Sequence, residues 1–227
     1  MKATFISSRI PLSLKLAYTA FLTVLVPVYW WKYGPSNFLY FCDLALFLTL
    51  AGLWRENRLL VSLPTLGILL PQALWCLDFA VQATGHRLTG MTAYMFEAQR
   101  PMFLRGLSLF HGWLPFLLLY LVSRLGYDRR ALPLWTAIAW IACLVSYFFI
   151  PGPSPENALA ASPSNVNYVW GMSDTTPQTW MPAPAYLVVW MLGLGTLVYL
   201  PTHWLLVRWF DQASTPAPTI RSMVGPG

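Results

Sequence analysis

Apolar residues occur along this chain in long, nearly unbroken stretches, and most polar positions fall between them. Six stretches stand out, at about 14–31, 37–54, 59–81, 103–122, 132–150 and 185–207. Each is long enough to cross about 30 Å of hydrocarbon as an α-helix that rises about 1.5 Å per residue. The pattern therefore predicts an all-α fold, an integral membrane bundle of six transmembrane helices that forms a single domain over residues 1–210.

Two of the predicted connections are long, at 82–102 and 151–184, and the second is rich in Pro, Ser, Asn and Thr. Tyr168, Trp170 and Trp180 in this second connection indicate that part of it folds back onto the bundle. The last residues, 211–227, are rich in Ser, Thr, Pro and Gly, a composition that predicts a disordered cytoplasmic tail.

Composition agrees with a membrane protein, since 57% of the residues are apolar and only 10% are charged, against about 25% charged residues in a typical soluble domain. The net charge of +6 comes from single Lys and Arg residues between apolar stretches. Because they form no basic block, a topology signal explains them better than nucleic-acid binding. The three cysteines lie inside apolar stretches without metal-site spacing, which favours buried packing.

The distribution of basic residues predicts the orientation. With the N-terminus in the cytoplasm, ten of the fourteen Lys and Arg residues fall on the cytoplasmic side: Lys2, Arg9, Lys15, Arg55, Arg58, Arg124, Arg129, Arg130, Arg208 and Arg221. Cytoplasmic loops of membrane proteins carry such an excess. We therefore expect both termini in the cytoplasm of a bacterial-type inner membrane, with the two long connections outside.

Four ionisable residues interrupt the predicted spans in the outer half of the membrane: Asp43, Asp78, Arg105 and His111. A carboxylate at the bilayer centre costs about 2.5–3.5 kcal/mol on insertion scales, so it needs a partner or a water-filled cavity. We expect the four side chains to form an outward-opening pocket, covered by the loop around residues 165–180. Each also has a local explanation, such as a structural hydrogen bond or a side chain that reaches the interface.

This pocket defines the candidate site residues. His111, Asp43 and Asp78 are the catalytic candidates, with His111 as a base oriented by a carboxylate. The ligand-binding candidates are Arg105, Ser108, Gln82 and Trp170. The chain has neither a G-x-S-x-G motif nor the H-x-x-x-H and H-E-x-x-H spacings of metal sites, so we predict no metal ligands and assign no cofactor.

Three classes of function fit these features. The first is a lipid-binding protein, with membrane lipids and an amphipathic small molecule as expected partners and with lipid modification as its enzymatic variant. The second is a transporter for a small molecule or an ion, which the prolines inside the spans favour. In the third, a structural or assembly protein, the polar cluster only stabilises the bundle.

Two segments, Tyr33–Thr49 and Phe110–Pro115, resemble a group of bacterial multi-pass membrane proteins, a resemblance that implies no particular activity. More remotely, the layout resembles the six-span membrane threonine hydrolases of fatty-acid esters. That resemblance implies a Thr and a His in neighbouring spans, and Thr49 and His111 would have to take those parts here.

Overall fold

The computed structural model describes residues 9–159 and 162–210, and these residues form helices and loops without a β-strand. The longer helices are α1 (Leu12–Tyr33), α2 (Phe41–Arg55), α3 (Arg58–Ala83), α5 (Phe110–Leu125), α6 (Ala131–Phe149), α8 (Ala183–Gly193) and α9 (Leu200–Phe210). The shorter segments are η1 (Pro35–Leu39), η2 (Ala93–Met95), α4 (Met102–Ser108), α7 (Pro155–Leu159), η3 (Val166–Tyr168) and the π-helical η4 (Leu194–Tyr199). The predicted disordered tail, 211–227, lies outside the described residues.

Five segments are long and apolar enough to cross a membrane: Leu12–Tyr33, Arg58–Ala83, Met102–Leu125, Ala131–Phe149 and Ala183–Phe210. They carry large apolar side chains on their outer surfaces, for example Phe116, Phe149 and Leu197, which are each more than 70% exposed. A soluble protein rarely presents so much contiguous apolar surface to water. The helical bundle is therefore compatible with a multi-pass membrane protein, as predicted.

The prediction of six transmembrane helices was wrong at the second stretch, 37–54. Its first residues belong to the short 3₁₀ helix η1, and an extended residue, Tyr40, separates η1 from α2. Gly34 ends α1 with a φ of +78°, and Pro35 then starts η1. Only 15 residues remain for α2, which at about 1.5 Å per residue fall short of the hydrocarbon thickness.

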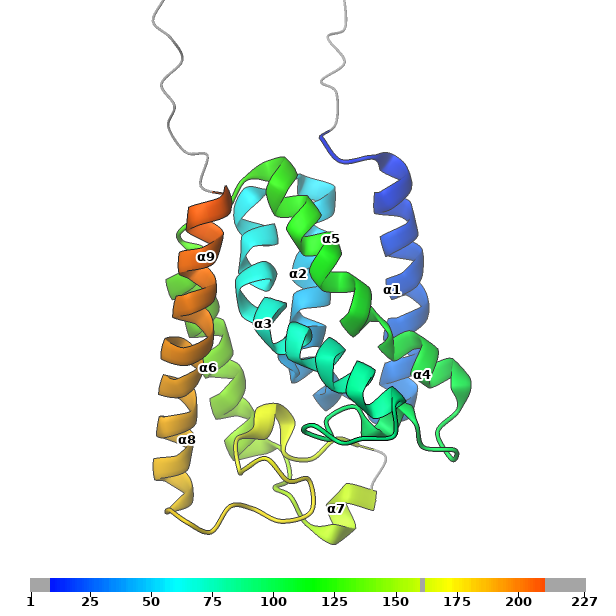
Figure 1. Ribbon diagram of the computed structural model, residues 1–227, viewed down its shortest axis with the longest axis vertical. Coiled ribbons are helices and arrows are strands. Elements are labelled where there is room, and N and C mark those ends of the chain that lie inside the picture. The colour runs from blue at the N-terminus through cyan, green and yellow to red at the C-terminus, as the bar shows by residue number, and fades with distance from the viewer. Residues whose placement is uncertain (1–8, 160–161, 211–227) are drawn as a thin grey trace, which may run out of the picture.

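The helices run alternately up and down, and the start of α1 and the end of α9 lie at the same end of the bundle (Figure 1). We call this the terminal end, and it also holds the short α2–α3 and α5–α6 turns. The connection 84–101 and the described parts of the connection between α6 and α8, 150–159 and 162–182, lie at the opposite end, which we call the loop end (Figure 1). The two longest connections thus share one end, as predicted.

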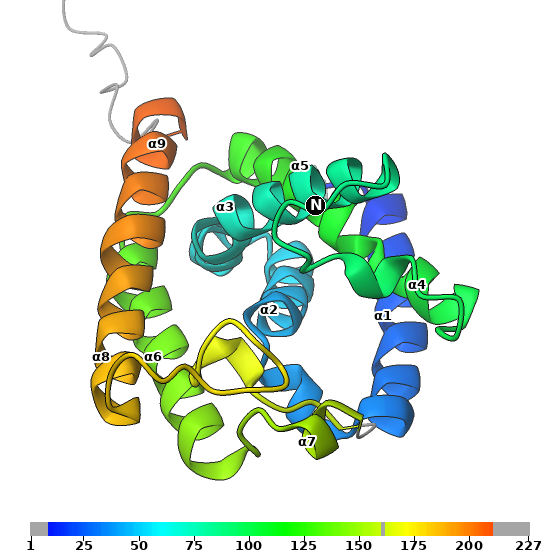
Figure 2. The same ribbon diagram turned by 60° about the horizontal axis from the view of Figure 1, so that its bottom comes forward.

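Inside the bundle, α2 lies between other helices (Figure 2), and α3 contacts α2, α5, α6 and α9. Gly67 permits the closest of these approaches, because a Cβ atom at this position would lie 1.8 Å from the ring of Trp135 on α6. Trp135 itself is fully buried. Pro64 and Pro71 lie within α3, which bends along its length (Figure 1), as the missing proline N–H groups permit.

Candidate functional site

Asp43 lies in the first turn of α2 at the loop end, and its side chain is only 3% exposed. Its Oδ2 accepts a hydrogen bond from Asn37 Nδ2 at 3.2 Å and lies 3.8 Å from Cys42 Sγ. The other oxygen, Oδ1, is buried and has no hydrogen-bond partner among the described residues. An unpaired buried oxygen costs about 1–3 kcal/mol.

The start of α2 is capped by Asn167, from the long connection between α6 and α8. Asn167 Oδ1 accepts a hydrogen bond from Phe41 N at 3.2 Å, and Asn167 Nδ2 donates to Leu39 O at 2.9 Å. Asn167 therefore bridges the break between η1 and α2. It adopts a left-handed conformation with a φ of +59°, which asparagine tolerates better than most residues.

Three more hydrogen bonds hold this part of the connection in place. Trp190 Nε1 on α8 donates to Asn167 O at 2.9 Å, and Tyr186 OH donates to Tyr168 O at 3.2 Å. Asn165 Nδ2 donates to Gly171 O at 2.8 Å and so closes a turn of the loop. The segment 165–171 thus forms an ordered cover over the N-terminus of α2.

Around Asp43, four elements contribute polar side chains that we call the polar cluster: Tyr29 (α1), Asp43 (α2), Tyr94 (η2) and Ser108 (α4). Tyr29 OH and Ser108 Oγ are hydrogen-bonded at 3.0 Å. The Tyr29 hydroxyl lies within electrostatic range of both Asp43 and Tyr94. Burial raises the pKa of the Tyr94 phenol to about 12, although the nearby side chains of Trp75 and Ser108 oppose the rise. Tyr94 is therefore neutral at physiological pH and can donate a hydrogen bond.

Two arginines fix the position of Tyr94. The Arg100 guanidinium lies over the Tyr94 ring, 5.1 Å from its centroid, and Arg100 NH1 donates to Tyr33 OH at 3.1 Å. Arg105 NH1 donates to the carbonyl of Met95 at 3.1 Å. These contacts attach the η2 loop to α1 and α4, and they bring two positive charges close to the polar cluster.

Gln72 on α3 is 3% exposed, and neither its Oε1 nor its Nε2 has a hydrogen-bond partner within the described parts of the chain. The antiparallel helices α2 and α3 touch where Gly52 meets Val61. Asp43 lies nine residues before Gly52 on α2, and Leu70 lies nine residues after Val61 on α3, so Asp43 and Leu70 lie at a similar height along the two helices. Gln72 lies about 3 Å beyond Leu70. A second unpaired polar side chain is therefore buried close to the level of Asp43.

Asp78 is fully buried, and both of its oxygens are engaged by the loop that follows α3. Oδ1 accepts hydrogen bonds from Thr89 N, Thr89 Oγ1 and Gly90 N at 2.6–3.0 Å. Oδ2 accepts from Thr92 N at 2.9 Å and Thr92 Oγ1 at 2.5 Å. Asp78 therefore stabilises residues 89–92, and we assign it no role in ligand binding.

His111 also has local partners. Its Nδ1 donates to the carbonyl of Ser108 at 2.8 Å, and its ring stacks on Trp75 and Phe110 with centroid distances of 5.2 Å and 4.0 Å. Thr49 donates its hydroxyl hydrogen to Ala45 O at 2.7 Å, one turn earlier in α2. Each member of the Thr49–His111 pair is thus bonded to a backbone carbonyl.

Gln82 and Trp170 complete the predicted set. Gln82 Oε1, close to the end of α3, is buried and unpaired within the described ranges. Trp170 stacks on Tyr147 of α6 at 4.3 Å, and its backbone N–H donates to Asn165 Oδ1 at 3.0 Å. These contacts of Trp170 attach the cover segment to α6.

Of the predicted residues, Asp43 and Ser108 therefore belong to the polar cluster, and Arg105 supports it through the η2 loop. Asp78 and His111 form bonds of their own. Sequence reasoning missed Tyr29, Tyr94 and Gln72. Gln72 could have been identified, because it is a polar residue that interrupts an apolar stretch. Tyr29 and Tyr94 could not, because in the sequence they resemble tyrosines at the membrane interface.

Within residues 9–159 and 162–210, no three His, Cys, Asp or Glu side chains come together in a group that could hold a metal ion. No family model, no curated protein and no solved structure matches this chain. The arrangement of the polar cluster is therefore the basis on which we propose a function. It combines buried hydrogen-bonding groups with nearby guanidinium groups inside an apolar bundle.

Proposed function

We propose that this protein binds the polar head of an amphipathic, lipid-like ligand at the polar cluster, in the loop-end half of a multi-pass membrane bundle. The observation that carries the proposal is the buried Asp43 Oδ1, which has no hydrogen-bond partner among the described residues. Native proteins usually satisfy such atoms, and functional sites are a recurring exception. A ligand head group would supply the missing partner.

The chemistry of the cluster narrows the class of ligand. A carboxylate oxygen accepts hydrogen bonds, so the head group needs a hydroxyl or ammonium donor for Asp43. Arg100 lies over Tyr94 and pairs with Glu97 at 3.6 Å, whereas Arg105 bonds to the neighbouring Met95 carbonyl. The charge of Arg105 favours a head group that also carries a negative charge. The apolar part of the ligand would then lie among the spanning helices, as in other amphipathic binding sites.

The proposed orientation places the loop end outside and both termini in the cytoplasm of an inner membrane. The described basic residues at the terminal end support it, because cytoplasmic ends are enriched in Lys and Arg. They are Arg9, Lys15, Arg55, Arg58, Arg124, Arg129, Arg130 and Arg208. The ligand would accordingly come from the outer leaflet or from the outer aqueous phase.

We propose binding without bond-making chemistry. Of the catalytic candidates, His111 Nδ1 and both Asp78 oxygens are bonded within the protein. Asp43 faces the proposed ligand, and its partners among the described residues are Asn37 and Cys42, not an imidazole that would act with it in acid–base catalysis. The prolines of α3 alone do not favour a transport cycle over simple binding.

The test is to compare the amphiphiles that copurify with the wild-type protein and with Asp43→Asn. The substitution preserves the shape of the side chain and its bond to Asn37, but it replaces one acceptor oxygen by an amide donor. We expect the enriched amphiphile to fall about tenfold per protein, the loss expected for one buried hydrogen bond. Quantitative lipid mass spectrometry after purification in one detergent gives the ratio.

Asp128→Asn is the matched control, because Asp128 lies in the α5–α6 turn at the terminal end and bonds to Arg130. Its amphiphile content should equal that of the wild type. If Asp43→Asn retained the wild-type content and only lowered the unfolding temperature, Asp43 would serve stability alone and the binding proposal would be overturned.

A further inference from the structure

Beside the polar cluster, α3 carries two buried side chains whose hydrogen-bonding groups have no partner in the described parts of the chain. Gln72 is 3% exposed and Trp75 is 6% exposed. The unpaired atoms are Oε1 and Nε2 of Gln72 and Nε1 of Trp75. Because the two residues are three apart on one helix, their side chains leave α3 on the same face.

Trp75 connects this face of α3 to the polar cluster. Its indole lies close enough to the Tyr94 phenol to oppose the rise in the pKa of that group. Its ring also stacks on Phe79 and on His111, with a centroid distance of 5.2 Å in each case. These contacts fix the ring beside Tyr94, and the indole N–H is left without an acceptor among the described residues.

Gln72 lies one turn deeper in the bundle than Trp75, close to the level of Asp43 on the neighbouring α2. Asp43 Oδ1 is itself buried and unpaired within the described ranges. On the other side, Tyr29 lies within electrostatic range of both Asp43 and Tyr94. Atoms without a partner are therefore brought to one region of the bundle by α2 and by α3.

Arg105 supplies a positive charge next to this region, one turn before Ser108 on α4. Its NH1 donates to Met95 O at 3.1 Å, and its NH2 lies 2.8 Å from the sulfur of Met102, which is a weak acceptor. Its Nε is buried and has no partner among the described residues. An anionic group of a ligand would satisfy both the charge and the free donor.

The unpaired atoms differ in what they require. The oxygens Asp43 Oδ1 and Gln72 Oε1 need a donor, whereas the nitrogens Gln72 Nε2 and Trp75 Nε1 need an acceptor. An ammonium group only donates, and an ionised phosphate oxygen only accepts. A hydroxyl group does both, so a pair of neighbouring hydroxyls is the simplest group that meets the whole set.

Depth determines the order of the two parts of the head group. Arg105 lies in the first turn of α4, at the loop end, whereas Gln72 lies about three turns from the loop end of α3. The anionic part would therefore lie nearer to the surface and the hydroxyl groups deeper in the bundle.

We propose that the head group bound at the polar cluster carries a vicinal diol that contacts Asp43, Gln72 and Trp75, next to a phosphate at Arg105. This inference rests on the function proposed above and names its ligand class. The ligand is an anionic lipid with a polyhydroxylated head group, of which phosphatidylglycerol is the simplest.

Native mass spectrometry tests the proposal with two lipids that differ only in their hydroxyl groups. The probes are phosphatidylglycerol and phosphatidylpropanol with identical acyl chains, which share one charge and a three-carbon head group. The protein is purified in an amine-oxide detergent, because a glycosidic detergent would itself offer hydroxyls. We expect the wild type to retain phosphatidylglycerol about tenfold better, or about threefold for each hydroxyl that forms a hydrogen bond.

Gln72→Met keeps the length of the side chain and removes both unpaired groups, and Trp75→Phe keeps an aromatic ring and removes the N–H. Neither change adds a buried polar group, so both proteins should fold. We expect the preference for phosphatidylglycerol to fall to about threefold in each variant. A preference that stayed at the wild-type value in both would overturn the assignment of the diol to these residues.

Trp140→Phe is the matched control for Trp75→Phe. Trp140 Nε1 on α6 already has an acceptor, the carbonyl of Met191 on α8, at 3.0 Å. The variant should therefore keep the wild-type preference between the two lipids. A loss as large as that in Trp75→Phe would show that the preference responds to any loss of an indole N–H, which contradicts a specific contact.

Phosphatidylethanolamine separates a failure of the diol from a failure of the proposed function. Equal retention of phosphatidylglycerol and phosphatidylpropanol by the wild type would overturn the diol. If phosphatidylethanolamine were then retained in the wild type and lost in Asp43→Asn, the proposed function would stand with an ammonium as the donor. If Asp43→Asn changed the retention of none of the three lipids, the proposed function would fail as well.

A competition separates a lipid from a soluble polyol phosphate. The competitor is glycerophosphoglycerol, the head group of phosphatidylglycerol without its acyl chains. We expect no displacement at millimolar concentration, because this molecule cannot bury an apolar part among the helices. Displacement as effective as that by a short-chain phosphatidylglycerol would contradict the assignment to a lipid.

Discussion

Asp78 accepts hydrogen bonds from three residues of the loop that follows α3, through both backbone and side-chain donors. Asp78→Ala removes all of these acceptors at once and leaves the buried donors of Thr92 without a partner, along with the part-buried donors of Thr89 and Gly90. Because hydrogen bonds to a charged group are each worth about 1.5–3 kcal/mol, we expect a loss of several kcal/mol and a loosened loop at 84–96. Hydrogen–deuterium exchange of this segment, measured with the unfolding temperature, provides the check.

Glu97→Gln is the control for this loop, since Glu97 is half-exposed and pairs with Arg100 only at 3.6 Å. It should leave exchange at 84–96 nearly unchanged. Exchange that is as slow in Asp78→Ala as in the wild type would show that the carboxylate does not hold the loop.

For Asp43 and Asp78, the sequence reveals only part of the environment of each carboxylate. The apolar stretches around Asp43 and Asp78 predicted that each carboxylate would need a partner or a water-filled cavity, and the structure buries both. Their partners could not be predicted, because Asn37 lies in the short 3₁₀ helix η1 and Thr89–Thr92 lie in a loop, and neither environment has a hydrophobic periodicity. Hydropathy gives the depth of a side chain but not the direction in which it points.

At the scale of helices, the contact between Gly67 of α3 and Trp135 of α6 is the most restrictive described here. Gly67→Ala would place a methyl group within the space of the indole ring. We expect a destabilisation of about 1–3 kcal/mol or a displacement of α6, because the fully buried Trp135 cannot move into solvent. Thermal unfolding in detergent measures the difference.

Gly112→Ala is the control for Gly67→Ala, since Gly112 lies inside α5 and a Cβ atom there would have no neighbour within 4 Å. Alanine favours a helix over glycine by about 0.8–1.0 kcal/mol, so this variant should be as stable as the wild type or more so. A Gly67→Ala protein that is no less stable than Gly112→Ala would contradict the close packing of α3 on α6.

Some of the helices could be predicted from the sequence, and others could not. Long apolar stretches located the five spans, because a helix that crosses a membrane is apolar on every turn. The same criterion failed for α2, where the apolar stretch continues through the break at Tyr40 and hydropathy does not register a change of backbone direction. The cap on α2 comes from Asn167, 126 residues further along the chain, a contact that no local signal predicts.

At the scale of the molecule, both ends of the described chain lie at one end of the bundle, and the long loops lie at the other (Figure 1). We expect an epitope tag inserted at the exposed Gly85 to be accessible to protease in intact cells, and a tag at the C-terminus to be protected. Gly85 is a suitable place, because an added Cβ there has no neighbour within 4 Å. A cleaved C-terminal tag with a protected tag at Gly85 would invert the orientation.

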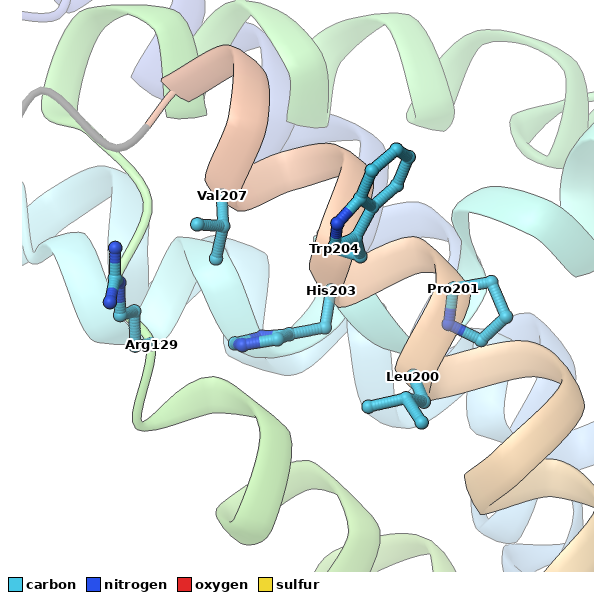
Figure 3. Close-up of a pocket in the computed structure, with 6 residues that line it drawn as sticks. All are labelled: Arg129, Leu200, Pro201, His203, Trp204 and Val207. Atoms are coloured by element: carbon cyan, nitrogen blue, oxygen red, sulfur yellow. The ribbon is translucent and has the colours of Figure 1, made fainter.

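The two ends of the bundle differ in their chemistry. The loop end holds a covered polar cluster with a carboxyl oxygen that has no partner among the described residues, and the terminal end holds an open cavity lined by Arg129 and residues of α9 (Figure 3). The proposed ligand of the polar cluster is one that donates hydrogen bonds.

A cryo-electron microscopy structure in nanodiscs made from native membrane lipids tests the central claim most directly. The account predicts an amphiphile head group at the polar cluster, with a donor atom within about 3.2 Å of Asp43 Oδ1. An Asp43 Oδ1 that accepts its hydrogen bond from a protein group, with no amphiphile between α1, α2 and α3, would contradict it.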